Sequence, residues 1–459
     1  MFIGRERELQ ELNRLFESDR FEFAVIYGRR RVGKTALITQ FIRDKDAIYF
    51  MGVESSSKQN LENLSKSIIE YSSGIEADTS FLSFQAALEY VFKLAETKRL
   101  ILVIDEYPYV ARASKSLAST LQMLIDRYRD SSKLMLILCG SSMSYMEDQV
   151  LAYKAPLYGR RSAQFKILPF NFSETCRYFP HFSPEEKALM YGIVGGTPQY
   201  LLQMNDRLSI EENIKNTFLN PNSAIYEEPS SLLKQEVREP SIYNAIITAV
   251  ATGASRMAEI SAKVGEDTSI CSVYIKNLIT LGIIRKESPY GEKSSRRTIY
   301  SIEDNMFRFW YRFVPENNSI IARGAVDLAY KRIEPNLPRY MGHVFEDICT
   351  QYLWSLLLHG KSPVDFSEIG RWWGTDPRTK SQTEIDIMAE QDRHIALFGE
   401  CKWTTQENGK QLTAELLRKA NLLPFAKNYT IVPMLFLKNA PKDDAGNAML
   451  PENVVELMK

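Results

Sequence analysis

The chain has 459 residues, long enough for about three domains, and its 44% hydrophobic and 25% charged residues are typical of globular proteins. Lys plus Arg and Asp plus Glu number 57 each, and this formal net charge of zero excludes a general electrostatic attraction of the whole molecule to nucleic acid. A nucleic-acid partner would have to bind a local basic patch.

The cysteines and the N-terminus bear on where the protein works. The five cysteines are scattered, with neither C-x-x-C pairs nor zinc-ligand spacing to the four histidines, which is typical of a reducing cytoplasm. The N-terminal segment MFIGRERELQE is charged from residue 5, and no run approaches the roughly 18 apolar residues of a membrane span. We expect a cytoplasmic protein without a membrane partner.

The predicted N-terminal domain, residues 1–235, alternates helices and strands. Apolar residues at helical spacing predict a helix over residues 5–17, and an apolar run over residues 22–27 predicts the first strand. Further strands are expected over residues 47–50, 99–104 and 133–138 and near residues 164–167, with helical stretches between them. This order predicts a parallel sheet covered on both faces.

A phosphate-binding loop follows the first strand. Gly28, Gly33, Lys34 and Thr35 fit the pattern G-x-x-x-x-G-K-[ST], with a strand before them and a helical pattern after them. Glycines at both ends let backbone N–H groups point at the phosphates, while Lys34 would reach the β- and γ-phosphates and Thr35 would bind Mg²⁺. The predicted nucleotide-binding residues here are Gly28, Arg29, Arg30, Arg31, Val32, Gly33, Lys34, Thr35 and Ala36. The alternative, a glycine-bounded turn that binds nothing, is disfavoured by the flanking elements.

Two acids end the buried strand LILVIDE. Ligand chemistry in α/β sheets lies at the carboxyl ends of the strands, so Asp105 would hold Mg²⁺ and Glu106 would polarise the attacking water. Acids also simply end strands, but the phosphate loop about 70 residues earlier favours the functional interpretation.

Two later positions could also serve phosphoryl transfer. Ser141 and Ser142 follow the strand LMLILCG and would lie beside the γ-phosphate, or would cap the next helix. Arg160 and Arg161 are candidates for neutralising charge on the γ-phosphate, with ordinary surface arginines as the alternative.

These motifs resemble those of the archaeal-type ATPase family among the AAA-related and STAND-like P-loop NTPases. The resemblance covers roughly the first half of the chain and includes IGRERE, YGRRRVGKT, LVIDE, PLYGRR and VGGTPQYL. It implies ATP as the ligand, an adenine pocket lined by residues 3–6, including Gly4 and Arg5, and a helical lid whose G-x-P element closes over the base with Pro198.

The middle domain, residues 236–315, has the order of a winged helix-turn-helix. Helical patterns over residues 241–252, 257–264 and 268–281 precede two short strands joined by a basic loop. Basic residues that could meet phosphates are Lys276, Lys293, Arg296 and Arg297, but Glu266, Asp267, Glu287 and Glu292 lie alongside. DNA binding and intramolecular packing therefore stay open as alternatives.

The C-terminal domain, residues 316–459, contains a helix over residues 341–358 and two strands, EIDIMAE and HIALFGECKW, joined by a turn at residues 391–393. Strand alternation predicts Ile385 and Ile387 on one face and Asp386 on the other, and predicts that Glu400 and Lys402 share a face opposite Cys401.

The acids of this domain suggest a metal site. With Glu346 upstream, Asp386 and Glu400 would bind one or two Mg²⁺ ions acting on a phosphodiester, and Lys402 would orient water or neutralise charge. The spacing resembles the PD-(D/E)XK nuclease fold, which implies metal-dependent cleavage of DNA. Solvent-facing charges also produce this short signature by chance.

The expected fold class is α/β: a P-loop NTPase sheet with a helical lid, a winged helix-turn-helix and a small restriction-endonuclease-like domain. The expected function is that of a switch, set by ATP and ADP, that controls a nuclease-like domain acting on DNA. An oligomer is compatible with this function. The alternatives are an ATPase regulator or adaptor whose C-terminal domain binds a partner or DNA without cleaving it, and a ring-forming remodeller.

Overall fold

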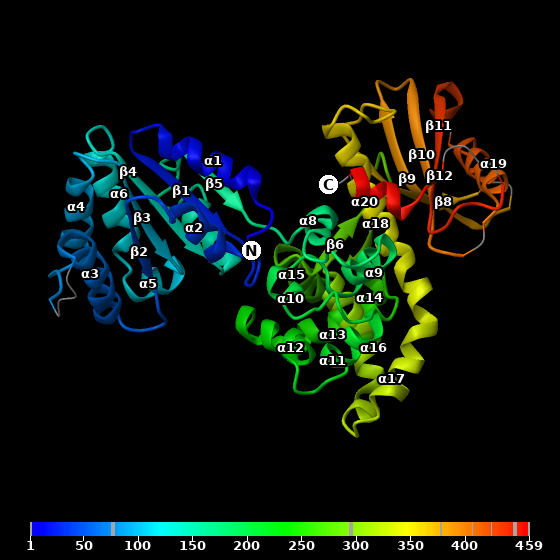
Figure 1. The fold of residues 1–459 in the computed structure, drawn as a ribbon, viewed down its shortest axis with the longest axis horizontal. Coiled ribbons are helices and arrows are strands. Elements are labelled where there is room, and N and C mark those ends of the chain that lie inside the picture. The colour runs from blue at the N-terminus through cyan, green and yellow to red at the C-terminus, as the bar shows by residue number, and fades with distance from the viewer. Residues whose placement is uncertain are drawn as a thin grey trace. The chain divides into compact units, whose positions relative to one another are not determined.

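The computed structural model describes residues 2–74, 79–292, 297–376, 379–405, 407–423, 425–443 and 448–457 (Figure 1). The chain forms two compact units. The first comprises Met1–Pro169 with Thr197–Gln199, and the second comprises Phe170–Gly196 with Tyr200–Lys459. The predicted domain boundaries at 235 and 315 both fall within the second unit and stay predictions.

The first unit is built on a parallel sheet of five strands in the order β2-β3-β4-β1-β5. The strands are β1 (Glu22–Tyr27), β2 (Ala47–Met51), β3 (Leu100–Asp105), β4 (Leu134–Gly140) and β5 (Ala163–Lys166). Every residue of β1, β3 and β4 is buried, as expected for apolar strands covered on both faces. The predicted α/β sheet is thus confirmed.

Helices cover both faces of this sheet (Figure 1). They are α1 (Glu6–Glu17), α2 (Lys34–Ile42), α3 (Ser57–Ser73), α4 (Phe84–Leu94), α5 (Tyr107–Ala113), α6 (Leu117–Tyr128), α7 (Met143–Tyr145) and the π-helix η1 (Met146–Leu151). Because strand side chains alternate, Ala24 and Ile26 pack with α1 and α2, whereas Phe23 and Val25 pack with the helices of the other face.

The second unit begins with helices and a strand pair. The elements are α8 (Phe172–Cys176), α9 (Pro184–Val194), α10 (Pro198–Leu201, which begins in the first unit), α11 (Ile210–Thr217), α12 (Ala224–Glu236), α13 (Pro240–Ala251), α14 (Met257–Val264), α15 (Thr268–Thr280), antiparallel β6 (Ile284–Glu287) and β7 (Ile299–Ile302), α16 (Asn305–Ile321), α17 (Val326–Ile333) and the 3-10 helix η2 (Glu334–Asn336). One hydrophobic cluster runs through them from Phe170 to Leu337. The predicted element order of the middle domain is present, and its winged-helix assignment stays a prediction.

A mixed sheet in the order β12-β11-β10-β9-β8 ends the chain. Its strands are β8 (Ile369–Thr375), β9 (Gln382–Gln391), β10 (Ile395–Lys402), β11 (Thr430–Leu437) and β12 (Ala448–Met449). Strands β8, β9 and β10 run antiparallel, and β10, β11 and β12 run parallel. The helices α18 (Leu337–Leu358) and α20 (Pro451–Leu457) pack on one face and α19 (Gly409–Ala420) on the other, and a 3-10 helix, η3 (Phe425–Asn428), precedes β11.

A bulge in β9 overturns one expectation from strand alternation. Gly370 pairs with Met388 and Trp372 pairs with Ile385, so two residues of β9 lie opposite one residue of β8. Ile385 consequently packs against the α19 side of the sheet and Ile387 against the α18 side. The prediction that these two isoleucines share a face was wrong, because a period of two fails where a residue is inserted.

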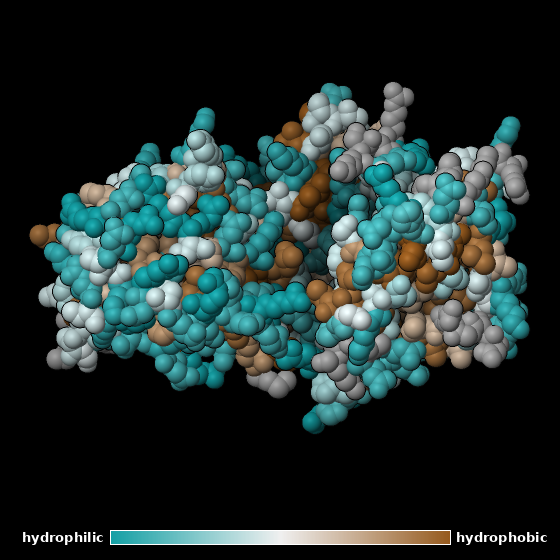
Figure 2. Space-filling view, turned by 90° about the horizontal axis from the view of Figure 1, so that it is seen from above, coloured by the Kyte–Doolittle hydropathy of each residue, from teal (hydrophilic) through white to brown (hydrophobic). Residues whose placement is uncertain are grey.

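The described helices include none that is long and apolar enough to cross a membrane. On the face drawn in Figure 2, hydrophilic side chains predominate and hydrophobic ones are interspersed among them.

Candidate functional site

The predicted phosphate loop lies between β1 and α2, and close packing explains its first glycine. A methyl group on Gly28 would lie 2.3 Å from the carbonyl oxygen of Ile167. Gly33 precedes α2 with a φ of 89°, a conformation that favours glycine. The buried Lys34 Nζ donates to the carbonyl oxygens of Gly28 at 2.9 Å and Arg29 at 3.0 Å. The loop is therefore wrapped around the ammonium group that was predicted to meet phosphates.

The two predicted magnesium ligands lie together. Thr35 Oγ1 donates to Asp105 Oδ2 at 2.9 Å, and Asp105 is 1% exposed. Tyr49 of β2 donates to the same oxygen at 2.7 Å. Burial, together with the negative charge of Asp105, raises the pKa of Tyr49, so this phenol stays a donor. Sequence reasoning missed Tyr49; its polar tip among the apolar residues of AIYFM was the available signal.

Glu106 contacts the next strand end. It precedes α5 with a φ of 49°, and its Oε2 accepts from Ser141 Oγ at 2.9 Å and from the Ser141 N–H at 3.4 Å. Ser142 precedes α7 without forming a side-chain cap and instead accepts from Arg112 Nη2 at 3.3 Å. The polar residues after β3 and β4 thus form one group at the carboxyl edge of the sheet. Their role at the γ-phosphate stays a prediction.

The candidate arginines lie elsewhere in the first unit. Ala24 of β1 pairs with Ala163, so Arg160 and Arg161 precede β5 near the amino end of β1, whereas the loop follows its carboxyl end. Arg160 also forms two 2.7 Å bonds with Asp126 of α6. Within this chain the structure does not bring either arginine to the phosphate loop.

One of the predicted adenine-side residues, Arg5, contacts the loop. Gly4 and Arg5 are buried, and Arg5 Nη2 donates to the carbonyl oxygens of Val32 at 3.1 Å and Leu168 at 2.5 Å. Arg29 Nη2 donates to Thr197 Oγ1 at 2.9 Å, an interaction that sequence reasoning did not identify.

Pro198 also lies beside the loop, because its Cγ would be 3.6 Å from a methyl group on Gly33. The segment Thr197–Gln199 therefore belongs with the loop although its sequence neighbours belong to the second unit.

A second polar group lies in the C-terminal sheet. Asp386 and Glu400 are each 5% exposed, and Asp386 Oδ2 accepts from the Cys401 N–H at 2.8 Å. Burial, then the negative charges of Glu346 and Glu400, raise the pKa of Asp386 to about 7. The carboxylates of Glu346 and Glu400 therefore lie close enough to Asp386 to affect its ionisation, as expected for three acids of one site.

Lysines surround Glu400. Lys402 Nζ lies 2.6 Å from Glu400 Oε1, and Lys419 Nζ of α19 lies 2.9 Å from Oε2. Cys401 packs on the opposite, α18 side, so the predicted sharing of a face by Glu400 and Lys402 holds. Burial lowers the pKa of Lys402, but the charge of Glu400 outweighs it and the net shift is upward. Sequence reasoning missed Lys419, because it lies 17 residues after Lys402 on another element.

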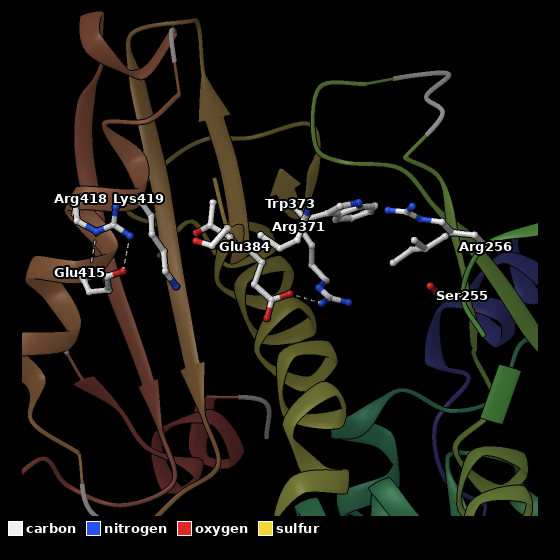
Figure 3. Close-up of a pocket in the computed structure, with 12 residues that line it drawn as sticks. Ser255, Arg256, Arg371, Trp373, Glu384, Glu415, Arg418 and Lys419 are labelled. Carbon is white, nitrogen blue, oxygen red and sulfur yellow. Dashed lines mark hydrogen bonds and ion pairs between the residues drawn. The ribbon is translucent and has the colours of Figure 1, made fainter. Parts of the chain in front are cut away.

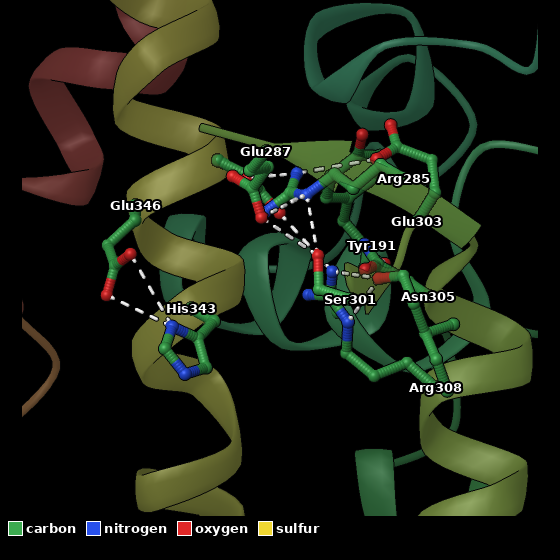
Figure 4. Close-up of polar contacts among 12 residues, drawn as sticks. Tyr191, Arg285, Glu287, Ser301, Glu303, Asn305, Arg308, His343 and Glu346 are labelled. Atoms are coloured by element: carbon green, nitrogen blue, oxygen red, sulfur yellow. Dashed lines mark hydrogen bonds and ion pairs between the residues drawn. The ribbon is translucent and has the colours of Figure 1, made fainter. Parts of the chain in front are cut away.

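Glu346 of α18 contacts two basic side chains. Its carboxylate lies 3.1 Å from Arg371 Nε and 3.3 Å from His343 Nδ1 (Figure 4). Among the described residues, no group of three or more His, Cys, Asp or Glu side chains is arranged to hold a metal ion. A magnesium site at Asp386 and Glu400 thus stays a prediction, and its two adjacent carboxylates are of the ligand type that Mg²⁺ takes.

The basic residues of the middle domain that were predicted to meet DNA phosphates differ in their surroundings. Lys293 and Arg296 lie outside the described residues. Arg297 pairs with Glu292 and donates from Nη1 to the Trp373 carbonyl of β8 at 2.6 Å. Lys276 is exposed on α15, where the apolar residue Val273 is exposed as well. Arg297 thus makes the kind of intramolecular contact that the second alternative expected.

Comparisons with known proteins cover most of the chain. Residues 2–204 match the model of an ATPase domain predominantly from Archaea, and residues 310–413 match that of archaeal and bacterial proteins of unknown function. The uncharacterized protein MJECL04 of Methanocaldococcus jannaschii is 34% identical over 439 residues, which are 94% of this chain and 95% of that protein.

Two further similarities concern the ATPase part. An uncharacterized ATP-binding protein of Methanocaldococcus jannaschii, MJ0423, is 44% identical over 45 residues, 10% of this chain and 76% of that protein. The Walker-type ATPase paby2304 of Pyrococcus abyssi is similar in fold, with a TM-score of 0.52 and 20% identity, covering 68% of this chain and 96% of that one. The predicted P-loop ATPase domain is confirmed at this level.

Proposed function

Because this chain belongs to the family of its Methanocaldococcus jannaschii relative and carries an archaeal-type ATPase domain, we propose that it is an ATP-hydrolysing switch controlling a nuclease-like domain that acts on DNA. The observation that carries the proposal is the grouping of Lys34, Thr35 and Asp105 at one edge of the parallel sheet. Thr35 and Asp105 are 2.9 Å apart, and Lys34 lies inside the loop.

These residues suit a magnesium nucleotide. Lys34 would exchange its two carbonyl acceptors for phosphate oxygens, and the loop N–H groups would bind the same phosphates. Thr35 and Asp105 would hold Mg²⁺, which supplies neutralisation of phosphate charge. Glu106, positioned by Ser141, would accept the proton of the attacking water.

The test is ATP hydrolysis by the full chain with Mg²⁺. We expect Lys34→Ala and Glu106→Gln each to lower kcat by roughly 100-fold or more, since a lost phosphate contact or general base has effects of this order. Lys58→Ala is the control, because this lysine side chain is 86% exposed on α3. Hydrolysis by Lys34→Ala at the wild-type rate would refute the assignment.

Nucleotide control would pass through Thr197–Gln199. This segment contacts the phosphate loop through Arg29 and continues on both sides into the second unit. A ligand shifts a conformational equilibrium only through different affinities for its states, so ATP and ADP should favour different arrangements. X-ray scattering profiles that are identical with ATP and with ADP would contradict this switch.

The nuclease-like part of the proposal is supported by the buried pair Asp386 and Glu400, with Lys402 on the same face as Glu400. Its test is cleavage of supercoiled, linear and branched DNA with Mg²⁺ or Mn²⁺, with and without ATP. Cleavage lost in Asp386→Ala, and responsive to ATP only when Lys34 is intact, is the expected result.

A specific observation favours a second candidate, a DNA- or partner-binding adaptor. Both oxygens of Glu400 are engaged by Lys402 and Lys419, and the described residues hold no three-ligand metal group. In this case DNA stays uncut with every metal, and Asp386→Ala retains the binding activity of the wild type.

A further inference from the structure

A pocket of about 610 Å³ lies within the second unit, beside the C-terminal sheet (Figure 3). It is lined by the start of α14, by β7, by β8 and β9, and by α19. Its volume is in the range of small-ligand sites, about 300–1,000 Å³. The middle and C-terminal parts of the chain thus build one pocket.

Cations outnumber acids in the lining. Four are basic residues, Arg256, Arg371, Arg418 and Lys419, and two are acids, Glu384 and Glu415. The acids are already paired, because Glu384 lies 3.4 Å from Arg371 and Glu415 lies 2.8 Å from Arg418. The exposed Arg256 adds charge that these acids do not balance. Acids outside the lining pair with three of these cations, because Glu346 lies 3.1 Å from Arg371, Asp376 lies 2.8 Å from Arg418 and Glu400 lies 2.9 Å from Lys419. Arg256 is therefore the lining cation that an anionic group would meet first.

An aromatic ring lies among these cations. Trp373 Nε1 donates to the Arg297 carbonyl at 3.1 Å, and the Trp373 carbonyl accepts from Arg297 at 2.6 Å. These two bonds tie β8 to the segment before β7 and orient the indole ring. Figure 3 shows Arg256 and Trp373 pointing toward each other across the pocket. An oriented aromatic face beside a guanidinium suits a base with an adjoining phosphate.

The pocket adjoins the acids of the C-terminal sheet. Its Lys419 lies 2.9 Å from Glu400, and its Arg371 lies 3.1 Å from Glu346. The pocket therefore lies beside two of the three acids that were predicted to act together in this sheet.

We propose that this pocket binds a single-stranded segment of nucleic acid, with an unpaired base on Trp373 and its phosphates on Arg256 and the neighbouring cations. The assignment of the substrate class rests on the proposed nucleic-acid function of the same domain. A base within a duplex cannot offer its face to Trp373, because it is stacked on both sides, so the pocket selects unpaired nucleotides.

The test is binding of the full chain to short fluorescein-labelled oligodeoxyuridylate and oligouridylate, which differ only in the sugar, measured by fluorescence anisotropy in EDTA. Trp373→Leu and Trp373→Phe both lose the bond to Arg297, but only the phenylalanine variant keeps an aromatic face. We expect the leucine variant to bind at least about five-fold more weakly and the phenylalanine variant within about two-fold of wild type. The tighter of the two oligonucleotides identifies the sugar.

A second pair of variants tests the phosphate contact. Arg256→Gln should lower the slope of log affinity against log salt by about 0.7, whereas Lys263→Gln, on α14 outside the pocket, should leave it unchanged. Equal losses in both Trp373 variants, or a duplex binding as tightly as the strand, would overturn the proposal.

The two proposals fail in different ways. Binding in EDTA without cleavage after metal addition would refute the nuclease-like assignment and leave the pocket intact. If the wild type does not bind single strands, the assignment of the pocket to nucleic acid is refuted, whatever the ATPase assay shows.

Discussion

Replacing Arg285 by Met should destabilise the second unit strongly. Arg285 of β6 lies 2.6 Å from Asp347 of α18, 3.2 Å from Glu287 and 3.4 Å from Glu303 (Figure 4). Its guanidinium therefore joins the strand pair to the long helix of the C-terminal domain, and three carboxylates depend on it.

The magnitude follows from burial. Removing one partner of a buried ion pair costs about 3–5 kcal/mol, and a charge-assisted hydrogen bond is worth about 1.5–3 kcal/mol. The Arg285 and Asp347 side chains are each 23% exposed, so water can reach the carboxylate left behind, and Arg308 remains 3.6 Å from it. We expect a loss of about 2–4 kcal/mol in the free energy of unfolding at neutral pH.

The loss should depend on pH. Burial favours a higher pKa for Asp347, but the charges of Arg285 and Arg308 outweigh burial and lower this pKa below its ordinary value. A lowered folded-state pKa gives stability that is present above the unfolded-state value of about 3.9 and is lost as the pH falls through the folded-state value. The cost of Arg285→Met should therefore shrink in acid.

Urea unfolding followed by tryptophan fluorescence is the assay. All five tryptophans lie in the second unit, so the signal reports this unit. Arg312→Met is the matched control, because Arg312 of α16 pairs only at 4.0 Å with Glu316 and the two side chains are 42% and 64% exposed. That variant should lose at most about 0.5 kcal/mol. Equal effects of the two substitutions would refute the reasoning.

Three further predictions follow from the two candidate sites. Without metal, Asp386→Asn should stabilise the protein more at pH 8 than at pH 4, because a carboxyl group with its pKa raised to about 7 loses its contribution as the pH rises; chemical denaturation at both values measures this. Gly28→Ala should abolish nucleotide binding, since its methyl group would meet a main-chain oxygen at 2.3 Å. As a control, Gly342→Ala places a methyl group within α18 where no atom lies within 4 Å, and it should raise the free energy of unfolding by roughly 0.5–1 kcal/mol. Tyr49→Phe removes a hydrogen bond to Asp105 and should change the Mg²⁺ dependence of ATP hydrolysis without unfolding the first unit, and an unchanged dependence would contradict this role.

Local patterns predicted the ATPase part well. The strand, the loop and the helix around Lys34 are contiguous, so their chemistry is written in one short stretch of residues. The turn between β9 and β10 was also readable, and Asp392 and Arg393 adopt the positive φ values of a tight hairpin.

Contacts between segments that are far apart in the sequence could not be predicted from local patterns. Tyr49 joins Asp105 because β2 lies next to β3, a pairing that the sequence does not specify. The candidate arginines precede β5 at the level of the amino end of β1, because β5 runs parallel to β1. Each outcome depends on strand order and direction, which arise from packing of the whole sheet.

The sequence by itself determined the apolar strands, the glycine-bounded loop and the alternation of charged residues in β10, since these depend on neighbours along the chain. Tertiary structure decided the bulge in β9, the engagement of Glu400 by Lys419 and the pocket around Trp373. The physical reason is that burial and pairing energies between segments far apart in sequence exceed local preferences, and one residue of strand register moves a side chain to the opposite face.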